Sequence, residues 1–218
     1  MKKRMFVATV LILSILCLSA QANVTYSFKH IVEQGDGPTQ LADGAIGEAQ
    51  LFVDVSDHGN DQVLFTFTNR GPRASSITDV YFDDGTLLGI SSIDDSGSGV
   101  SFSQYASPKN LPGGNLLSPP FVTTSGFSAD SDPAVQPNGV NPGESLGIVF
   151  NLQDDKKYKN VIADLTSGDL RTGIRVQGFE SGGSEAFVNN RVIPAPGAVV
   201  LGSIGTLLVG WLQRRKRL

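Results

Sequence analysis

The chain has 218 residues, of which 40% are hydrophobic, and its 17 basic and 21 acidic side chains give a formal net charge of −4. Seven of the basic residues lie near the two ends, so residues 23–192 carry 10 basic and 21 acidic side chains, a net charge of −11. A surface this acidic repels phosphate groups and anionic lipid headgroups, which excludes nucleic acid as an expected partner.

The N-terminal segment, residues 1–22, has the pattern of a secretory signal peptide. Three basic residues precede an apolar run over residues 5–18, and Ala20-Gln21-Ala22 forms a small-x-small cleavage site. The single cysteine, Cys17, lies in this segment, so the exported protein would contain no disulfide. We therefore expect an exported chain, with an uncleaved N-terminal anchor as the alternative.

Residues 23–190 are expected to form one extracytoplasmic domain of β-strands. Apolar and polar residues alternate over residues 24–29, which predicts a half-buried strand. Two stronger runs, Leu51 to Val55 and Val63 to Thr68, flank the turn-forming residues 56–61, which predicts an antiparallel hairpin. Further strands are predicted at Thr78–Phe82, Leu87–Ile90, Val100–Tyr105, Leu146–Leu152, Gly173–Phe179 and Ala186–Asn189.

The fold class follows from what separates these strands. No amphipathic helical stretch of ten or more residues is predicted, and residues 159–165 are expected to form only a short helical turn. Connections rich in Gly, Pro and Ser cover residues 107–120 and 128–143. Antiparallel strands with one apolar face must bury that face against another sheet. We therefore expect an all-β, antiparallel β-sandwich of the jelly-roll or immunoglobulin-like type, with a closed barrel as the alternative.

The domain offers few groups for catalysis. His30 and His58 are the only histidines, and no Gly-x-Ser-x-Gly turn accompanies them. Acidic pairs such as Asp83-Asp84 are adjacent in sequence beside turn residues, which indicates turns rather than the convergent carboxylates of a glycosidase. We therefore expect a protein that is not an enzyme, has no catalytic residues and requires no cofactor.

A calcium site is one alternative for the hairpin turn. Asp54, Asp57, Asn60 and Asp61 cluster there, and hard cations prefer six to eight oxygen ligands of this kind. The spacing does not match an EF-hand, and the same residues also suit a simple turn. Both interpretations remain open from the sequence.

Carbohydrate binding is a second expected function class, because many carbohydrate-binding modules share an all-β fold. Such modules present aromatic platforms to sugar rings. The domain has no tryptophan, since the single one is Trp211, and the platforms outside the first strand are Tyr81, Tyr105 and Tyr158.

The C-terminal segment, residues 191–218, combines a proline motif, an apolar run over 197–212 and a basic tail. As a helix, the uncharged residues 198–212 would be about 22 Å long, shorter than the ~30 Å hydrocarbon core, so we expect a marginal transmembrane helix. An interfacial tryptophan and positive charges at its end would hold the C-terminus in the cytoplasm. These anchoring residues are Trp211, Arg214, Arg215, Lys216 and Arg217.

The terminal segment, from Val192 to Leu218, resembles the sorting signal of the PEP-CTERM proteins of Gram-negative bacteria. The family's Pro-Glu-Pro motif is matched by Pro194, Ala195 and Pro196, with alanine in place of the acid. The resemblance implies that an exosortase, a protease of the inner membrane, cleaves near the motif and passes the protein toward the cell surface or matrix, where exopolysaccharide is a further partner. An unprocessed membrane anchor is the alternative.

Overall fold

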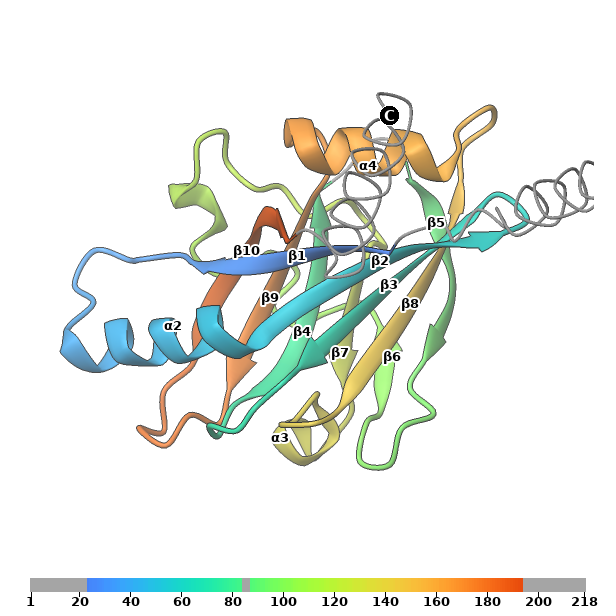
Figure 1. Ribbon diagram of the computed structural model, residues 1–218. Helices are drawn as coiled ribbons and strands as arrows, with labels where there is room; N and C mark the ends of the chain where they lie inside the picture. The colour runs from blue at the N-terminus through green and yellow to red at the C-terminus, as the bar shows by residue number, and fades with distance from the viewer. Residues whose placement is uncertain (1–22, 84–86, 194–218) are drawn as a thin grey trace, which may run out of the picture.

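The computed structural model describes residues 23–83 and 87–193. In this part of the chain ten strands form one antiparallel sheet, in the order β5-β8-β3-β2-β1-β10-β9-β4-β7-β6 (Figure 1). The strands are β1 (Val24–His30), β2 (Leu51–Gly59), β3 (Gln62–Asn69), β4 (Ser76–Asp83), β5 (Leu87–Asp94), β6 (Phe102–Gln104), β7 (Ser128–Ser131), β8 (Ser145–Leu152), β9 (Arg171–Gln177) and β10 (Glu185–Ile193). The helices are α2 (Pro38–Gln50), α3 (Val135–Asn138) and α4 (Tyr158–Ser167), with a 3₁₀ turn, η1 (Gly114–Leu116).

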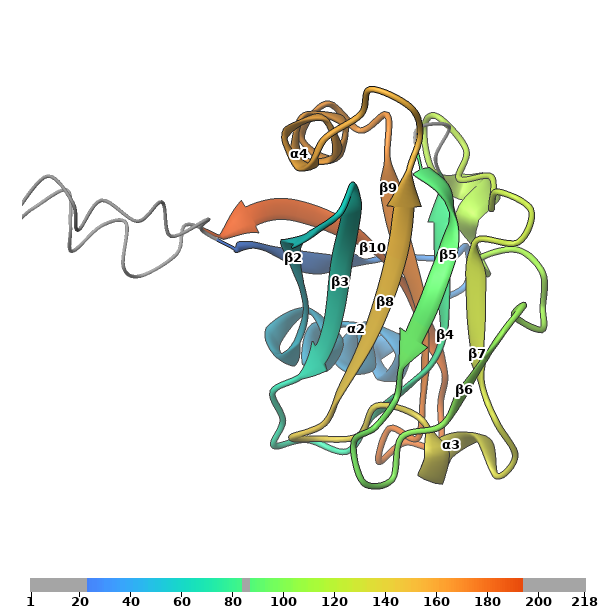
Figure 2. The same ribbon diagram turned by 90° about the vertical axis from the view of Figure 1, so that its right-hand side faces the viewer.

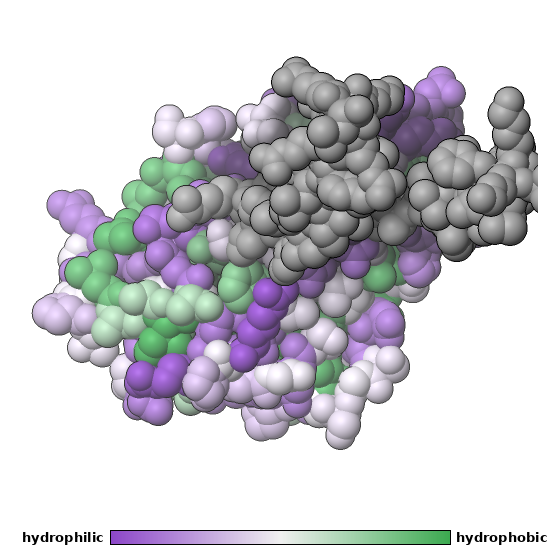
Figure 3. All heavy atoms as spheres, viewed as in Figure 1, coloured by the Kyte–Doolittle hydropathy of each residue, from purple (hydrophilic) through white to green (hydrophobic). Residues whose placement is uncertain are grey.

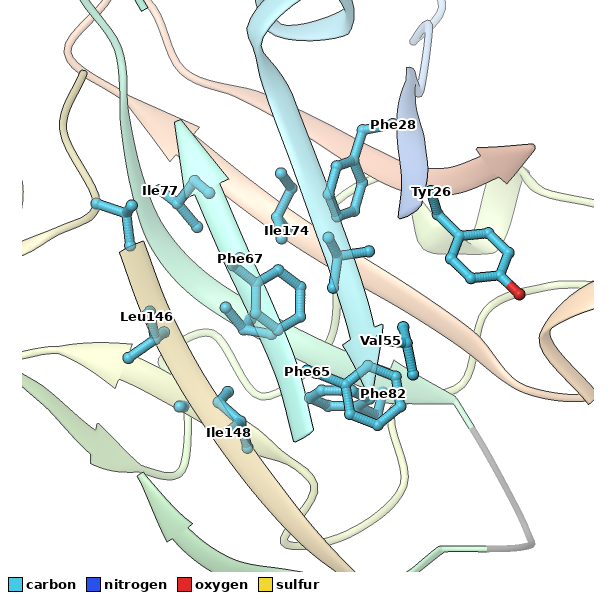
Figure 4. Packing of buried hydrophobic residues seen from close by; sticks show 14 of the residues in the cluster. Tyr26, Phe28, Val55, Phe65, Phe67, Ile77, Phe82, Leu146, Ile148 and Ile174 are labelled. Atoms are coloured by element: carbon cyan, nitrogen blue, oxygen red, sulfur yellow. The ribbon is translucent and has the colours of Figure 1, made fainter. Parts of the chain in front are cut away.

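The sheet curls over so that its two halves face each other across the core (Figure 2). Phe82 of β4 contacts Phe65 of β3 and Phe150 of β8, with ring centroids 5.1 and 4.6 Å apart. These strands are distant in the sheet order, so their contact requires the sheet to fold back on itself. Figure 4 shows Phe65 and Phe82 packed together among the aliphatic side chains of the core. Edge-to-face ring pairs add about 0.5–1.5 kcal/mol each beyond the area they bury.

The prediction of a mainly antiparallel β fold is confirmed. The predicted hairpin is formed by β2 and β3, and Asn60 and Asp61 at its turn have φ values of 49° and 58°. The predicted division into two separate sheets is not observed, because β1 pairs with β2 on one side and β10 on the other, which joins the halves. The sheet is close to a barrel, the alternative, with β5 and β6 at its edges.

The prediction that no helix reaches ten residues is wrong. Helix α2 has 13 residues and α4 has 10, extending past the predicted turn at 159–165 at both ends. Helix α2 was missed because Gly44 and Gly47 weaken its helical pattern. Both glycines are required by packing: an added Cβ at Gly44 would lie 2.2 Å from the His30 ring, and one at Gly47 2.3 Å from the ring of Phe187.

The long connection between β6 and β7, residues 105–127, is here called the cover loop. Its buried side chains Leu111 and Phe121 form a second, small core with Tyr81 of β4 and Ala186 of β10. Arg171 of β9 donates hydrogen bonds to the carbonyls of Pro119 and Pro120, at 2.7 Å each. The cover loop is therefore packed on the outer face of the sheet, where the sequence indicated only an irregular connection.

Among the described residues, no helix combines the length and apolar character needed to cross a membrane. The expected span at 197–212 and the signal peptide at 1–22 lie outside the described residues. The same is true of the sorting motif and anchoring residues, Pro194, Ala195, Pro196, Trp211, Arg214, Arg215, Lys216 and Arg217.

Candidate functional site

Two hollows adjoin the cover loop and are the candidate sites. The first, here called the Tyr105 groove, has a volume of about 450 Å³. It is lined by Tyr105, Ala106, Lys109, Asn110, Thr123, Thr124, Ser125, Gly126 and Ser128. The second, here called the acidic pocket, has a volume of about 290 Å³. It is lined by Ile31, Glu33, Asp36, Gln40, Pro108, Pro112, Arg175, Ser184, Glu185 and Ala186.

Tyr105 presents its ring to solvent from a well-anchored backbone. Its side chain is 69% exposed, and its φ of 79° lies in the left-handed region, which is uncommon outside glycine. The amide of Tyr105 donates to the carbonyl of Ser128 at 2.8 Å, and the next amide, of Ala106, donates to the Ser128 hydroxyl at 3.0 Å. Gln104 donates to the carbonyl of Gly126 at 2.7 Å. These bonds fix both walls of the Tyr105 groove and hold the ring at its rim.

The structure separates the three tyrosines that the sequence offered as sugar platforms. Tyr81 is fully buried and donates to the carbonyl of Pro108 at 3.0 Å. Tyr158 is half-buried and donates to the carbonyl of Val55 at 2.9 Å. Of these three rings, Tyr105 alone is exposed and lines a hollow.

Beside the acidic pocket, a histidine lies close to two carboxylates that line it. His30, at the end of β1, contacts Glu185, at the start of β10, with 2.8 Å between Nε2 and Oε2. Both residues are nearly inaccessible, at 7% and 9% exposure. Asp36, on the loop before α2, offers an oxygen within 4.8 Å of both. Val32 and Leu41, each next in the chain to a pocket-lining residue, are exposed. Figure 3 shows apolar residues gathered at the left of the molecule.

Several acids act on Glu185 together. Burial raises the pKa of this carboxyl, and the charges of Asp36 and Asp43 raise it further, whereas the hydrogen bond from His30 opposes them. Asp43, on α2, is only 4% exposed and accepts a hydrogen bond from the hydroxyl of Ser181. Negative charge therefore exceeds positive charge around His30.

A second group of charges runs across the outer face of the sheet beside this pocket. The register places Asp130 of β7, Asp79 of β4 and Arg175 of β9 in one row. Asp79 is fully buried, and burial, reinforced by the charge of Asp130, raises its pKa to about 6. Its Oδ2 accepts from Thr78 at 2.8 Å, whereas Oδ1 has no hydrogen-bond partner among the described residues. Burial also raises the pKa of Tyr81 beside it.

The residues predicted to hold calcium have other partners. Asp54 accepts hydrogen bonds from Thr25 and from Arg70, and Asp61 pairs with Lys157. The Oδ1 of Asp57 accepts from the amide of Gly59 at 2.8 Å, and Asn60 forms the turn itself. Within the described ranges, His30, Asp36 and Glu185 are a group of histidine and carboxylate side chains close enough to share a metal ion.

No sequence pattern indicated that His30, Asp36 and Glu185 would lie together. His30 and Glu185 are 155 positions apart, and neither lies in a short motif with the other. Their contact follows from the pairing of β1 with β10, in which His30 lies opposite Phe187. The contact between His30 and Glu185 could have been predicted only by first predicting that β1 pairs with β10.

A scan against protein-family models finds no match, and neither does a search of the curated proteins.

Proposed function

We propose that this chain is an exported, non-enzymatic protein of the cell surface or extracellular matrix, sorted through its C-terminal segment. The support is the segment that resembles a PEP-CTERM signal: the motif at 194–196, the short apolar run at 197–212 and the basic tail. An apolar signal peptide at residues 1–22 supports export independently. The acidic β-domain lies between the two segments, as expected for an exported cargo.

The observation that carries the proposal is the position of the two ends of the β-domain. Thr25 of β1 pairs with Ile193 of β10, so the first and last strands are neighbours that end together. A chain that continues beyond Ile193 thus leaves the domain where the N-terminal segment enters it. In Figure 2 these strand ends lie on the left, and the cover loop, in yellow-green, lies on the right. A domain tethered by its C-terminal segment would present the cover loop away from the membrane.

In this proposal the apolar run crosses the inner membrane transiently. Trp211 lies at the interface and the basic tail, residues 214–217, stays in the cytoplasm because positive charges are retained there. Pro194 and Pro196 keep the preceding chain extended, since proline fixes φ and cannot donate the hydrogen bonds of a helix. An extended segment at the membrane surface is accessible to an exosortase-type protease, which then releases the domain.

The test expresses the full chain in a Gram-negative host with and without an exosortase, and identifies its C-terminal peptide by mass spectrometry. We expect loss of the peptide that follows the motif only when the exosortase is present. The double variant Pro194→Ala with Pro196→Ala should stay intact, whereas Pro38→Ala, at an exposed proline outside the motif, should be processed normally. An intact Leu218 terminus on wild-type protein in the exosortase host would reject sorting and favour an unprocessed anchor.

Binding of exopolysaccharide is the second candidate function, and the Tyr105 groove favours it. A sugar ring has apolar faces that stack on an exposed aromatic ring, and hydroxyls that pair with polar groups at its edge. Tyr105 supplies such a ring beside the polar side chains of Lys109, Asn110 and Ser125. The groove lies on the side that a C-terminal tether would leave free.

A further inference from the structure

We propose that His30, Asp36 and Glu185 form a binding site for a divalent transition-metal cation, for which Zn²⁺ is the test ion. The proposal rests on side chains that the fold brings together from β1, the loop before α2 and β10. Each offers one ligand atom, and the three atoms lie within 4.8 Å of one another. This site is independent of the sorting signal and of the Tyr105 groove.

The imidazole of His30 is held with one nitrogen directed at Glu185. Strand pairing places His30 opposite Phe187, and the two rings contact each other with centroids 5.5 Å apart. Helix α2 closes over the other side of the His30 ring at Gly44, where an added Cβ would lie 2.2 Å from Nδ1. The ring thus has little room to turn, and Nε2 stays 2.8 Å from the Glu185 carboxylate. A fixed ring nitrogen beside a carboxylate is a preorganised pair of metal ligands.

The backbone around the site is also fixed. The amide of His30 donates to the side chain of Glu48 on α2 at 3.0 Å, and the amide of Ile31 donates to the carbonyl of Ala186 at 2.9 Å. The third ligand, Asp36, has one oxygen that accepts from the amide of Glu33 at 2.8 Å. Its carboxylate is therefore oriented by its own loop.

The charge balance favours a cation. Glu185 and Asp43 are both more than nine-tenths buried, Asp36 is half-buried, and Glu33 lines the same pocket. His30 contacts Glu185 directly and Arg175 lines the same pocket, so one imidazole and one guanidinium stand against four carboxylates. Buried carboxylates are costly unless they are paired or coordinate a metal. A divalent cation would supply the missing positive charge.

The acidic pocket gives such an ion a route to its ligands. Asp36 and Glu185 both line it, together with Gln40, Ser184 and Arg175, and His30 adjoins it through its contact with Glu185. Its volume of about 290 Å³ leaves space for the water molecules that complete the coordination of a three-ligand site. Entry therefore does not require the sheet to open.

The ligand types select a transition metal over calcium. Imidazole nitrogen suits Zn²⁺ and its neighbours, whereas Ca²⁺ requires six to eight oxygens. Bonds of about 2.0–2.2 Å in a tetrahedral site place ligand atoms roughly 3.3 Å apart. The His30 and Glu185 atoms would therefore separate slightly from 2.8 Å. Asp36 would approach by up to about 1.5 Å, a movement that a loop residue can make more readily than a strand residue.

The test titrates Zn²⁺ into the full chain, purified without a histidine tag in detergent, and follows heat of binding and melting temperature. We expect one Zn²⁺ per chain and a higher melting temperature. His30→Gln and Glu185→Gln should each weaken binding at least tenfold. The matched control, His58→Gln, removes the other histidine, which is exposed on the β2–β3 hairpin, and should bind as the wild type does.

A further variant and a further ion keep the result decisive if His30→Gln fails to fold. Asp36→Asn changes a half-buried loop residue and should fold, yet bind Zn²⁺ at least tenfold more weakly. Co²⁺ should give the visible absorption bands of a four- or five-coordinate site in wild-type protein and lose them in the Asp36 variant. Absence of Zn²⁺ binding, or binding that none of these variants weakens, would overturn the site. Ca²⁺ bound as tightly through the same residues would overturn its assignment to a transition metal.

Discussion

Asp79 on β4 lies directly opposite Arg175 on β9, and its side chain is completely buried. Arg175 lies in the strand predicted at Gly173–Phe179, and the register places an acid opposite it on the neighbouring strand. The negative charge of Asp79 is poorly compensated, since its pKa is raised to about 6 and its Oδ1 has no hydrogen-bond partner among the described residues. The consequence is a specific dependence of stability on pH.

We expect Asp79→Asn to stabilise the protein above pH 6. A carboxyl whose pKa is raised to about 6 binds a proton more tightly when folded than when unfolded. The folded state is therefore favoured below the unfolded pKa near 4 and loses stability as pH rises through 4 to 6, by at most about 3 kcal/mol in total. Asparagine removes this loss and keeps the acceptor for Thr78. Urea unfolding of the full chain at pH 4, 5, 6 and 7 measures the effect.

The control for this experiment is Asp132→Asn. Hydrogen bonds from Ser101 and Ser103 lower the pKa of Asp132, so its contribution is present above the unfolded pKa and is lost as pH falls below about 4. Its replacement should leave the slope between pH 4 and 6 unchanged. Glu185, whose pKa burial also raises, should leave a smaller residual slope in Asp79→Asn. A slope as steep as that of the wild type would show that Asp79 does not contribute to it.

Gly47→Ala should destabilise the protein, although the same change in an exposed helix normally stabilises it. Helix propensity favours alanine by about 1 kcal/mol. Here the new Cβ would lie 2.3 Å from the buried ring of Phe187, and overpacking of this kind costs about 1–3 kcal/mol or more. Denaturant midpoints measure the difference. Gly89→Ala on β5, where no atom lies within 4 Å of the new Cβ, should be close to neutral. A stabilised Gly47→Ala would show that α2 is not packed on β10 as described.

Tyr105→Ala should abolish glycan binding if the Tyr105 groove is a sugar site. The variant removes an exposed ring that buries no core surface, so the melting temperature should change little. We expect at least a tenfold loss of affinity for whichever array glycan binds the full chain. Leu88→Ala is the matched control, since Leu88 is also exposed, at 61%, but lies on β5 outside the groove. Equal binding by wild type and Tyr105→Ala would reject the groove as the site.

The local alternation of apolar and polar residues was sufficient to predict most of the strands. Leu51, Val53 and Val55 alternate with less buried residues, and a strand with one buried face has that period whatever packs against it. The turn at Asn60 and Asp61 could also be predicted from the local residues, because these side chains tolerate positive φ. Strand β7 was missed, since Ser128 to Ser131 has a single apolar residue and lies in a stretch that reads as a connection.

The sequence by itself thus determined the antiparallel β character of the domain, its main hairpin, and the charged and apolar segments on which export and sorting are proposed. Only the tertiary structure decided that the strands form one curled sheet, that α2 is a helix, and that His30 meets Glu185. These features depend on contacts between residues far apart in the chain, such as Gly47 with Phe187. Periodicity reports which face of an element is buried, but it carries no information about what lies against that face.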